Sequence, residues 1–346
     1  MVTKRELRCG PSTLNSLWQG EFPGARFGHI RSGTLQNTLT SAVTFAGQGL
    51  HTGLPVRMTV GPAAADHGIW FRRTDVTDRN ALVPARWDAV VPSRLCTLVA
   101  NADGVSVSTI EHVMAALAGM AIHNALIEID GPEVPILDGS AAPFVDGLLT
   151  GGLRDQGVPV RAIRVLQTVE VRDGEAVARL EPSDIMEIDF RIDFAEAAIG
   201  RQSRRLNMAN GAFVRELSDS RTFCRKVDVD YMRANGLALG GTMDNAVVFD
   251  GDAVLSPGGL RHADEPVRHK MLDALGDLAL AGGPILGRYT GDRAGHAMTN
   301  RLLRALFTTP GAYRIVDCTG LSGGKLPGVG VQRGDLPVRR EIPVRA

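Results

Sequence analysis

The chain has 346 residues, of which 44% are hydrophobic and 22% charged, so its composition is that of a soluble globular protein long enough for two domains. Basic and acidic residues number 38 each, and a net charge of zero gives no reason to expect nucleic acid or an anionic membrane as a partner. The sequence has neither an apolar run of about eighteen residues nor an N-terminal apolar signal segment, so we expect a cytoplasmic protein without a transmembrane segment.

The two ends of the chain differ from its body. Residues 1–35 are rich in Gly and Arg, and residues 311–346 are rich in Gly and Pro. Neither segment shows a sustained hydrophobic period, so we expect a disordered N-terminal extension and a loose C-terminal tail.

Between these ends, segments typical of strands and of helices follow one another irregularly. β-Branched and alternating patterns predict strands over residues 56–60, 124–130, 164–172, 187–194 and 245–250. A doubly wound parallel sheet would require strict alternation of strands and helices, so α+β is the expected fold class. Glycines and charges over residues 151–159 indicate a domain boundary, and no internal repeat is evident in the sequence.

The first clear helix is predicted to begin near Ser108. Val113, Leu117 and Met120 recur at spacings of four and three and form its apolar stripe. Ser108 and Glu111 have the spacing of a capping box, in which Glu111 would bond back to the Ser108 amide. His112 beside it fits equally a histidine of the core, so this helix alone does not decide between a structural and a catalytic role.

The second clear helix begins at Glu265-Pro266 and ends before Gly282-Gly283-Pro284. It carries two stripes roughly 200° apart around its axis. The apolar stripe consists of Val267, Met271, Leu275 and Leu278, and the polar stripe of His269, Asp273 and Asp277. The polar stripe is compatible with a solvated face holding an i,i+4 contact, or with an imidazole and a carboxylate that share a metal ion.

Other segments add chemically useful residues. The four cysteines are widely spaced and form no C-x-x-C pair, which favours free thiols over disulfides or a cysteine zinc site and leaves histidines as the candidate metal ligands. Ser-Arg-Thr-Phe at 220–223 places a hydroxyl beside an aromatic ring, and His296 follows Gly295, where the backbone can approach a ligand closely. Two His and one Asp, with a further Glu and His, indicate a metal-activated hydrolase.

Five motifs carry a resemblance to a known family. STIEHVMAALAGM (108–120), EVPILDGSAAPF (133–144), SRTF (220–223), VRHKMLDALGDL (267–278) and GHAMTN (295–300) occur in the order and at the separations typical of it. The chain resembles the UDP-3-O-acyl-N-acetylglucosamine deacetylases of lipid A biosynthesis over residues 36–310. The extension and the tail lie outside this resemblance.

The resemblance implies roles for individual residues. One catalytic zinc ion would be held by His112, His269 and Asp273, with Fe²⁺ as an alternative occupant. The acid–base and oxyanion groups would be Glu111 as general base, His296 as second acid–base group, Asp277 as the partner that orients His296, and Thr222 as the oxyanion donor. Substrate contacts would come from Lys270, Phe223 and Arg293. An apolar passage for the acyl chain would correspond to residues 227–249, with Tyr231, Met232, Leu237 and Leu239 either lining it or belonging to the core.

The resemblance also implies a fold and an activity. The fold would be α+β, with two similar layered domains of helices packed against sheets over residues 36–158 and 159–310, each with a small insert, and the active site between them. Met114, Leu117, Met271, Leu275 and Leu278 are expected in the core. The activity would be hydrolysis of the N-acetyl group of the UDP-linked substrate by a monomer in a Gram-negative bacterium. An Fe(II) oxygenase and a non-catalytic UDP-sugar-binding metalloprotein remain alternatives.

Overall fold

The computed structural model describes residues 34–93, 95–318 and 325–336. The disordered extension predicted over residues 1–35 therefore lies almost wholly outside the described residues. Among the helices that are described, none is both long enough and apolar enough to span a membrane.

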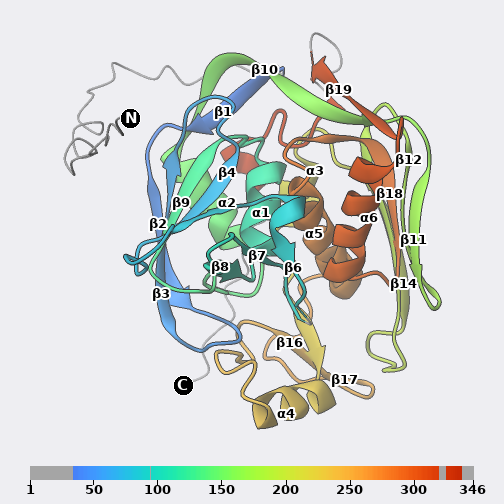
Figure 1. Cartoon of the computed structure of the whole chain (residues 1–346). Coiled ribbons are helices and arrows are strands. Elements are labelled where there is room, and N and C mark those ends of the chain that lie inside the picture. Colours follow the sequence, from blue (N-terminus) through green and yellow to red (C-terminus); the bar gives the residue numbers. More distant parts are fainter. Residues whose placement is uncertain (1–33, 94, 319–324, 337–346) are drawn as a thin grey trace, which may run out of the picture. The chain divides into compact units, whose positions relative to one another are not determined.

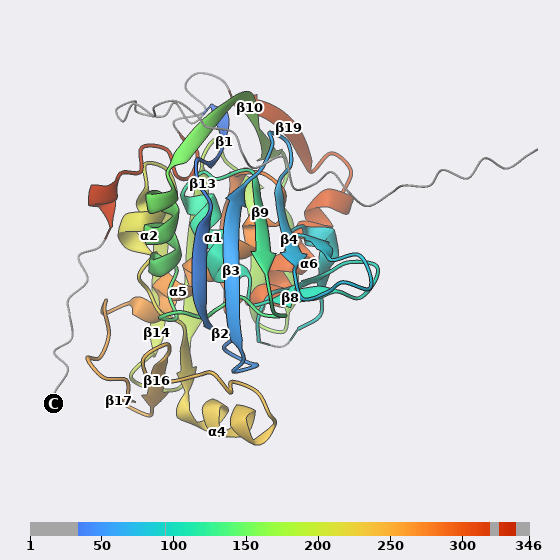
Figure 2. The same ribbon diagram turned by 90° about the vertical axis from the view of Figure 1, so that its left-hand side faces the viewer.

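The N-terminal half contains a five-stranded sheet in the order β2-β3-β9-β4-β5. Its strands are β2 (Val43–Gln48), β3 (Pro55–Pro62), β4 (Ile69–Arg73), β5 (Leu82–Pro84) and β9 (Ala125–Ile129). Helices α1 (Glu111–Gly119) and α2 (Ala142–Gly151) lie on one face of this sheet (Figure 2). Alternate residues of β9 are buried, as expected for a strand with one face on the core.

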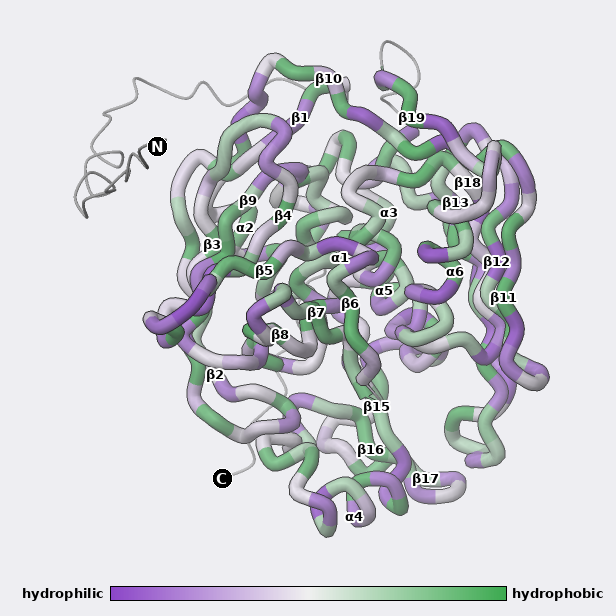
Figure 3. The backbone as a smooth tube through the Cα atoms, viewed as in Figure 1, coloured by the Kyte–Doolittle hydropathy of each residue, from purple (hydrophilic) through white to green (hydrophobic). Residues whose placement is uncertain are grey.

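The C-terminal half contains a larger sheet around a central strand, β18 (Ile285–Asp292). On one side of β18 lie β12 (Ala176–Pro182) and then β11 (Val169–Asp173), and on the other side lie β13 (Met186–Asp193) and then β14 (Arg201–Asn207). Helices α5 (Glu265–Ala279) and α6 (His296–Thr308) pack against these strands. Hydrophilic and hydrophobic residues alternate along the hairpin of β11 and β12 (Figure 3), which is the two-residue period of a half-exposed sheet.

The two halves have the same topology. In the N-terminal half, β3 is antiparallel to β2 and β9, β9 is parallel to β4, and β4 is antiparallel to β5. The same relations hold for β12 with β11 and β18, for β18 with β13, and for β13 with β14. This confirms two similar layered α+β units. The sequence analysis found no repeat because the repetition lies in strand order and direction, not in residue identity.

Each half carries an insert. It lies between β5 and α1 in the N-terminal half, and between β14 and α5 in the C-terminal half. The first insert comprises a 3-10 turn (Trp87–Ala89) and the antiparallel strands β6 (Val90–Val91), β7 (Leu98–Ala100) and β8 (Ser106–Ser108). The second follows a short helix, α3 (Ala212–Glu216), and comprises β15 (Phe223–Arg225), α4 (Lys226–Ala234), β16 (Val247–Asp250) and β17 (Ala253–Val254). The prediction of an insert in each half is therefore confirmed.

Helices α1 and α5 lie side by side between the two sheets (Figure 1). Their close approach depends on Gly276, because a Cβ atom at this position would lie 2.0 Å from the Glu111 carbonyl oxygen. The core expected on these helices is confirmed, since all five of its members are buried: Met114, Leu117, Met271, Leu275 and Leu278.

Strands β10 and β11 bear on two predictions of the sequence analysis. The strand predicted over 164–172 is two strands, because β10 (Leu153–Val165) ends before β11 begins. Most of the segment 151–159, over which a domain boundary was predicted, lies in the first part of β10, which pairs with β1 (Leu35–Leu39). The glycine and the charged residues of this segment lie in a largely exposed strand, and the boundary itself stays a prediction. The division into domains 36–158 and 159–310 stays a proposal.

The expectation of a loose tail is wrong for part of residues 311–346. Strand β19 (Tyr313–Cys318) pairs along six residues with β10 and covers an edge of that strand. Leu326 and Val329 are buried in a small cluster with Cys318. The prediction of a loose tail followed from the high Gly and Pro content of the segment and did not take these few apolar residues into account. Cys96, Cys224 and Cys318 are free thiols, as predicted, and Cys9 lies outside the described residues.

Candidate metal centre and active site

Three predicted metal ligands from two helices meet at one point. His112 lies in the first turn of α1, and His269 and Asp273 lie one turn apart on α5. Their ligand atoms all lie within 4.8 Å of one another. The Asp273 Oδ1 atom is 3.3 Å from His269 Nε2 and 3.6 Å from His112 Nε2. All three side chains are buried, so the interpretation of a solvated polar face on α5 is wrong.

The protonation of these groups suits a cation. The Nδ1 atom of His269 is 3.0 Å from the Ser220 carbonyl oxygen, so Nδ1–H donates there and the Nε2 lone pair faces Asp273. Burial lowers the pKa of His269 to about 4, which keeps the ring neutral. Burial would raise the pKa of Asp273, but His269 and Lys270 outweigh it and hold that pKa well below its usual range.

One carboxylate oxygen of Asp273 is satisfied and the other is not. Lys270 Nζ donates to Oδ2 at 2.8 Å. The buried Oδ1 finds no hydrogen-bond partner among the described residues. Buried polar atoms are nearly always paired, and an unpaired carboxylate oxygen facing two imidazole nitrogens fits a divalent cation.

Glu111 is turned toward this centre and does not cap the helix. Helix α1 begins at Glu111, whereas Ser108 ends β8 and its hydroxyl donates to the Pro132 carbonyl at 3.2 Å. The capping-box interpretation is therefore wrong. A left-handed backbone conformation at Thr109 (φ 58°) separates the strand from the helix. The Glu111 Oε2 atom accepts the Thr97 amide at 3.1 Å, and burial raises the pKa of Glu111.

His296 and Asp277 form a second pair next to Glu111. His296 is the first residue of α6, and its Nδ1 atom is 2.8 Å from Asp277 Oδ2. Its Nε2 atom is 3.6 Å from Glu111 Oε1. Burial would lower the pKa of His296, but Asp277 and Glu111 outweigh burial and raise it to about 9. A pKa of about 9 keeps the His296 ring protonated at neutral pH.

A cavity of about 700 Å³ connects this centre with the second insert. Its lining includes His269, Asp273, His296 and Lys270, and it also includes the predicted oxyanion and aromatic residues Thr222 and Phe223. The ring of Phe223 meets His269 edge-on at 6.3 Å between centroids. Of the residues predicted for the acyl passage, Tyr231, Met232 and Leu237 line the cavity. Leu239 instead lies beside Gly53 and is 57% exposed.

The loop before α2, which contains part of the motif over 133–144, holds Thr222 in place. The Thr222 amide donates to the Gly139 carbonyl at 2.8 Å, and the Val247 amide donates to the Thr222 carbonyl at 2.8 Å. Gly139 has φ 81°, and a Cβ there would lie 1.9 Å from the Asn245 carbonyl oxygen. Only glycine permits this close approach.

Arg293 is the predicted site residue that neither lines the cavity nor contacts the cluster around Asp273 and His296. Its guanidinium group forms ion pairs with Asp193 and Glu175, each at 2.6 Å. We therefore leave Arg293 out of the proposed site. Sequence reasoning missed Thr97, which contacts both Glu111 and Asp277, because nothing in its local sequence marks such a role.

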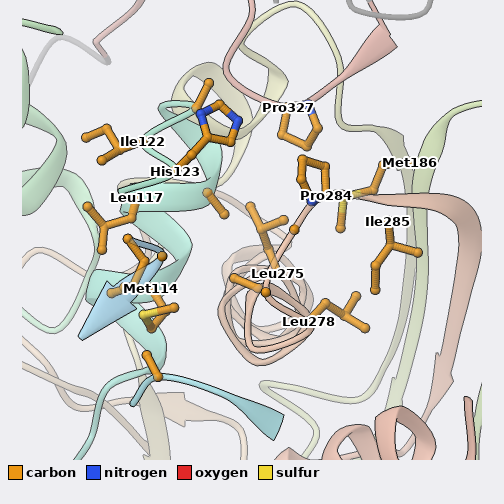
Figure 4. A pocket seen from close by; sticks show the side chains of 18 residues that line it. Met114, Leu117, Ile122, His123, Met186, Leu275, Leu278, Pro284, Ile285 and Pro327 are labelled. Atoms are coloured by element: carbon orange, nitrogen blue, oxygen red, sulfur yellow. The ribbon is translucent and has the colours of Figure 1, made fainter. Parts of the chain in front are cut away.

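A second, smaller cavity of about 90 Å³ lies between α1 and α5 (Figure 4). Met114 and Leu117 face it from α1, and Leu275 and Leu278 face it from α5. Its lining is almost entirely apolar and contains none of the predicted catalytic residues. It shares no lining residue with the active-site cavity and is distinct from it.

The chain is similar in sequence to known deacetylases along most of its length. The sequence model of the UDP-3-O-acyl N-acetylglycosamine deacetylase family matches residues 36–308. A UDP-3-O-acyl-N-acetylglucosamine deacetylase of Phenylobacterium zucineum is 50% identical over 280 residues, covering 81% of this chain and 96% of the relative. Enzymes of the same name from Anaeromyxobacter sp. and Shewanella sp. are 46% and 45% identical, covering 89% of this chain and 96% and 97% of the relatives.

Proposed function

The chain belongs to the UDP-3-O-acyl N-acetylglycosamine deacetylase family, and from this premise we propose that it hydrolyses the N-acetyl group of UDP-3-O-acyl-N-acetylglucosamine. It is an enzyme that hydrolyses an amide. The proposed products are acetate and the free amine, in a step of lipid A biosynthesis in the cytoplasm. The observation that carries the proposal is the buried cluster of His112, His269 and Asp273 with Glu111 and His296 beside it.

We propose zinc as the ion that this cluster holds. His112 Nε2, His269 Nε2 and Asp273 Oδ1 would be its ligands, a set of three that leaves a position open, as in catalytic zinc sites. The ion supplies a Lewis acid that activates water and polarises the acetyl carbonyl. Fe²⁺ accepts the same donor types and is the alternative occupant.

The acid–base steps fall to Glu111 and His296. Glu111 accepts the proton of the attacking water, and its raised pKa makes it a stronger base than an ordinary carboxylate. The water oxygen bonds to the acetyl carbon, and the Thr222 hydroxyl donates to the oxygen that becomes negative. When the C–N bond breaks, His296 Nε2–H gives its proton to the leaving nitrogen. Asp277 holds His296 in the protonated form through Nδ1.

The cavity supports a substrate with both polar and apolar parts. Its volume of about 700 Å³ lies within the range typical of small-molecule sites. Tyr231, Met232 and Leu237 present apolar surface for the acyl chain on the side of the second insert. We propose that Lys270 and Phe223, which line the cavity next to the metal ligands, contact the sugar.

Acetate release tests the proposal directly. The full-length protein with one equivalent of zinc is expected to release acetate from UDP-3-O-acyl-N-acetylglucosamine, and a chelator is expected to abolish release until zinc is restored. Zinc-loaded protein that binds the substrate without releasing acetate would contradict the proposal and favour a non-catalytic UDP-sugar-binding metalloprotein. Oxygen consumption coupled to turnover would instead favour the Fe(II) oxygenase.

A further inference from the structure

One residue of the first insert contacts both halves of the acid–base machinery. Thr97 is 4% exposed and lies just before β7. Its amide donates to Glu111 Oε2 at 3.1 Å, and its hydroxyl donates to Asp277 Oδ1 at 2.5 Å. Its carbonyl oxygen accepts the Ile110 amide at 3.4 Å, directly before Glu111. Two of the three polar groups of Thr97 therefore contact proposed catalytic residues, and the third binds the backbone just before Glu111.

The Thr97 hydroxyl holds the carboxylate of Asp277. Asp277 has two oxygens, of which Oδ2 faces His296 Nδ1 and Oδ1 receives the Thr97 hydroxyl. Rotation of the carboxylate about its bond to Cβ would break both contacts at once. Without the hydroxyl, Oδ1 would be a buried acceptor that lacks this donor, a condition that carries a large penalty. Thr97 thus restricts Asp277 to the orientation that serves His296.

The backbone contact has a complementary effect on the base. Glu111 lies on α1, whereas Asp277 lies on α5 and His296 on α6. Thr97 belongs to none of these three helices, and it binds Glu111 through its amide and Asp277 through its hydroxyl. Thr97 therefore helps to set the distance between Glu111 and the Asp277–His296 pair. Without Thr97, this distance would depend on the packing of the helices alone.

We propose that Thr97 is a positioning residue of the acid–base pair, in which the side-chain hydroxyl holds Asp277 in line with His296 while the amide holds Glu111. The proposal rests on the proposed deacetylase function. A purely structural explanation is that the hydroxyl only satisfies a buried polar atom. The two explanations differ in what the removal of the hydroxyl does to His296.

The test compares Thr97→Val, which removes the hydroxyl at nearly constant shape, with Thr97→Ser, which keeps it. In zinc-loaded full-length protein, Thr97→Val is expected to lower kcat on the order of ten- to a hundredfold with KM changed less than about twofold. The alkaline limb of the pH–rate profile is expected to move to lower pH, because a displaced Asp277 stabilises the His296 imidazolium less. Thr97→Ser is expected to keep both kcat and the alkaline limb close to those of the wild-type protein.

Thr38→Val is the matched control. Thr38 is also buried, and its hydroxyl donates to the Asn124 carbonyl at 2.7 Å and accepts the Ala63 amide at 2.9 Å, outside the active site. This variant is expected to lose stability while its kcat and pH profile stay unchanged. Zinc content and melting temperature are measured for every variant. They distinguish a misfolded variant from a folded one in which the Asp277 carboxylate is displaced.

A readout independent of turnover distinguishes failure of this proposal from failure of the proposed function. The His296 ring can be titrated by NMR in histidine-labelled protein, with the signal assigned from a His296→Gln variant. Asp277, Glu111 and Asp273 are the charged groups that act on this ring. Folded, zinc-loaded Thr97→Val with an unshifted His296 titration would overturn the proposal, as would a Thr97→Ser variant that behaves like Thr97→Val. Absence of acetate release from the wild-type protein would count against the proposed function alone.

Discussion

At His296, burial and charge act on the imidazole in opposite directions. Burial disfavours the imidazolium, but Asp277 and Glu111 outweigh burial and raise the pKa to about 9 from its ordinary 6.5. Because the pKa is raised, the proton donor is present below about pH 9 and is lost as the pH rises through that value. The alkaline limb of the activity profile therefore belongs to this residue in the proposed mechanism.

Asp277→Asn removes the charge that dominates this shift. The pKa of His296 is expected to fall, so that the alkaline limb of kcat/KM moves to lower pH and activity above neutral pH declines. Measurement of kcat/KM between pH 5 and pH 10 checks this, with zinc content as the control. An alkaline limb that remains in place would show that another group gives rise to it.

In the proposed mechanism Glu111 is the general base and not a metal ligand, so its loss would remove the base and leave the proposed ligands in place. Glu111→Ala is expected to lower kcat by roughly 10²- to 10⁴-fold, the usual scale of general acid–base catalysis, while zinc remains bound. Parallel assays of acetate release and zinc stoichiometry test this, with Glu111→Gln as the variant of similar size. A rate near that of the wild-type protein would refute the assignment of the base.

At the scale of elements, the pairing of α1 with α5 determines whether the metal ligands meet. His112 lies on α1, and His269 and Asp273 lie on α5, so their separation follows the separation of the two helices. Gly276 sets that separation, because its missing side chain makes room for the backbone at Glu111.

Gly276→Ala would place a Cβ atom 2.0 Å from the Glu111 carbonyl oxygen, and the helices must move apart to accept it. We expect a loss of roughly 1–3 kcal/mol of stability from overpacking and at least about a tenfold weaker affinity for zinc. Thermal unfolding and zinc titration measure the two effects. Gly334→Ala is the control, since a Cβ there meets nothing within 4 Å and both quantities should stay unchanged.

Periodic patterns were the reliable part of the sequence analysis. The 3.6-residue period located both helices that carry the ligands, and the two-residue pattern located β3, β9, β13 and β16 near their observed bounds. Two features of the sequence led to wrong predictions. Ser108 and Glu111 have capping-box spacing, but the left-handed turn at Thr109 assigns them to different elements. Abundant Gly and Pro concealed β19, whose pairing with β10 depends on residues far away in sequence.

The motifs indicated the members of the active site but not how they are held. Thr97 lies 14 residues from Glu111 and 180 residues from Asp277, and its two contacts exist only after the halves assemble. The position of Arg293 away from the cavity likewise depends on contacts between residues far apart in the sequence. Its two acidic partners lie about a hundred residues earlier, so no local pattern announces the ion pairs.

At the scale of the whole molecule, the repeated topology explains why the site lies where it does. In each half, an insert leads into the helix that carries metal ligands, α1 in the first and α5 in the second. Packing these helices together brings His112 from one half to His269 and Asp273 from the other. A cation bound there connects the two halves, so its binding must also stabilise their association.

Zinc titration of the metal-free full-length protein, followed by both acetate release and thermal unfolding, tests this account most directly. We predict that one zinc ion per chain restores acetate release and raises the melting temperature, with about 2.7 kcal/mol of stabilisation at a hundredfold excess over Kd. His112→Ala is expected to weaken both responses together. Full acetate release by protein free of metal, or tight binding of one zinc by His112→Ala with the same rise in melting temperature, would contradict it.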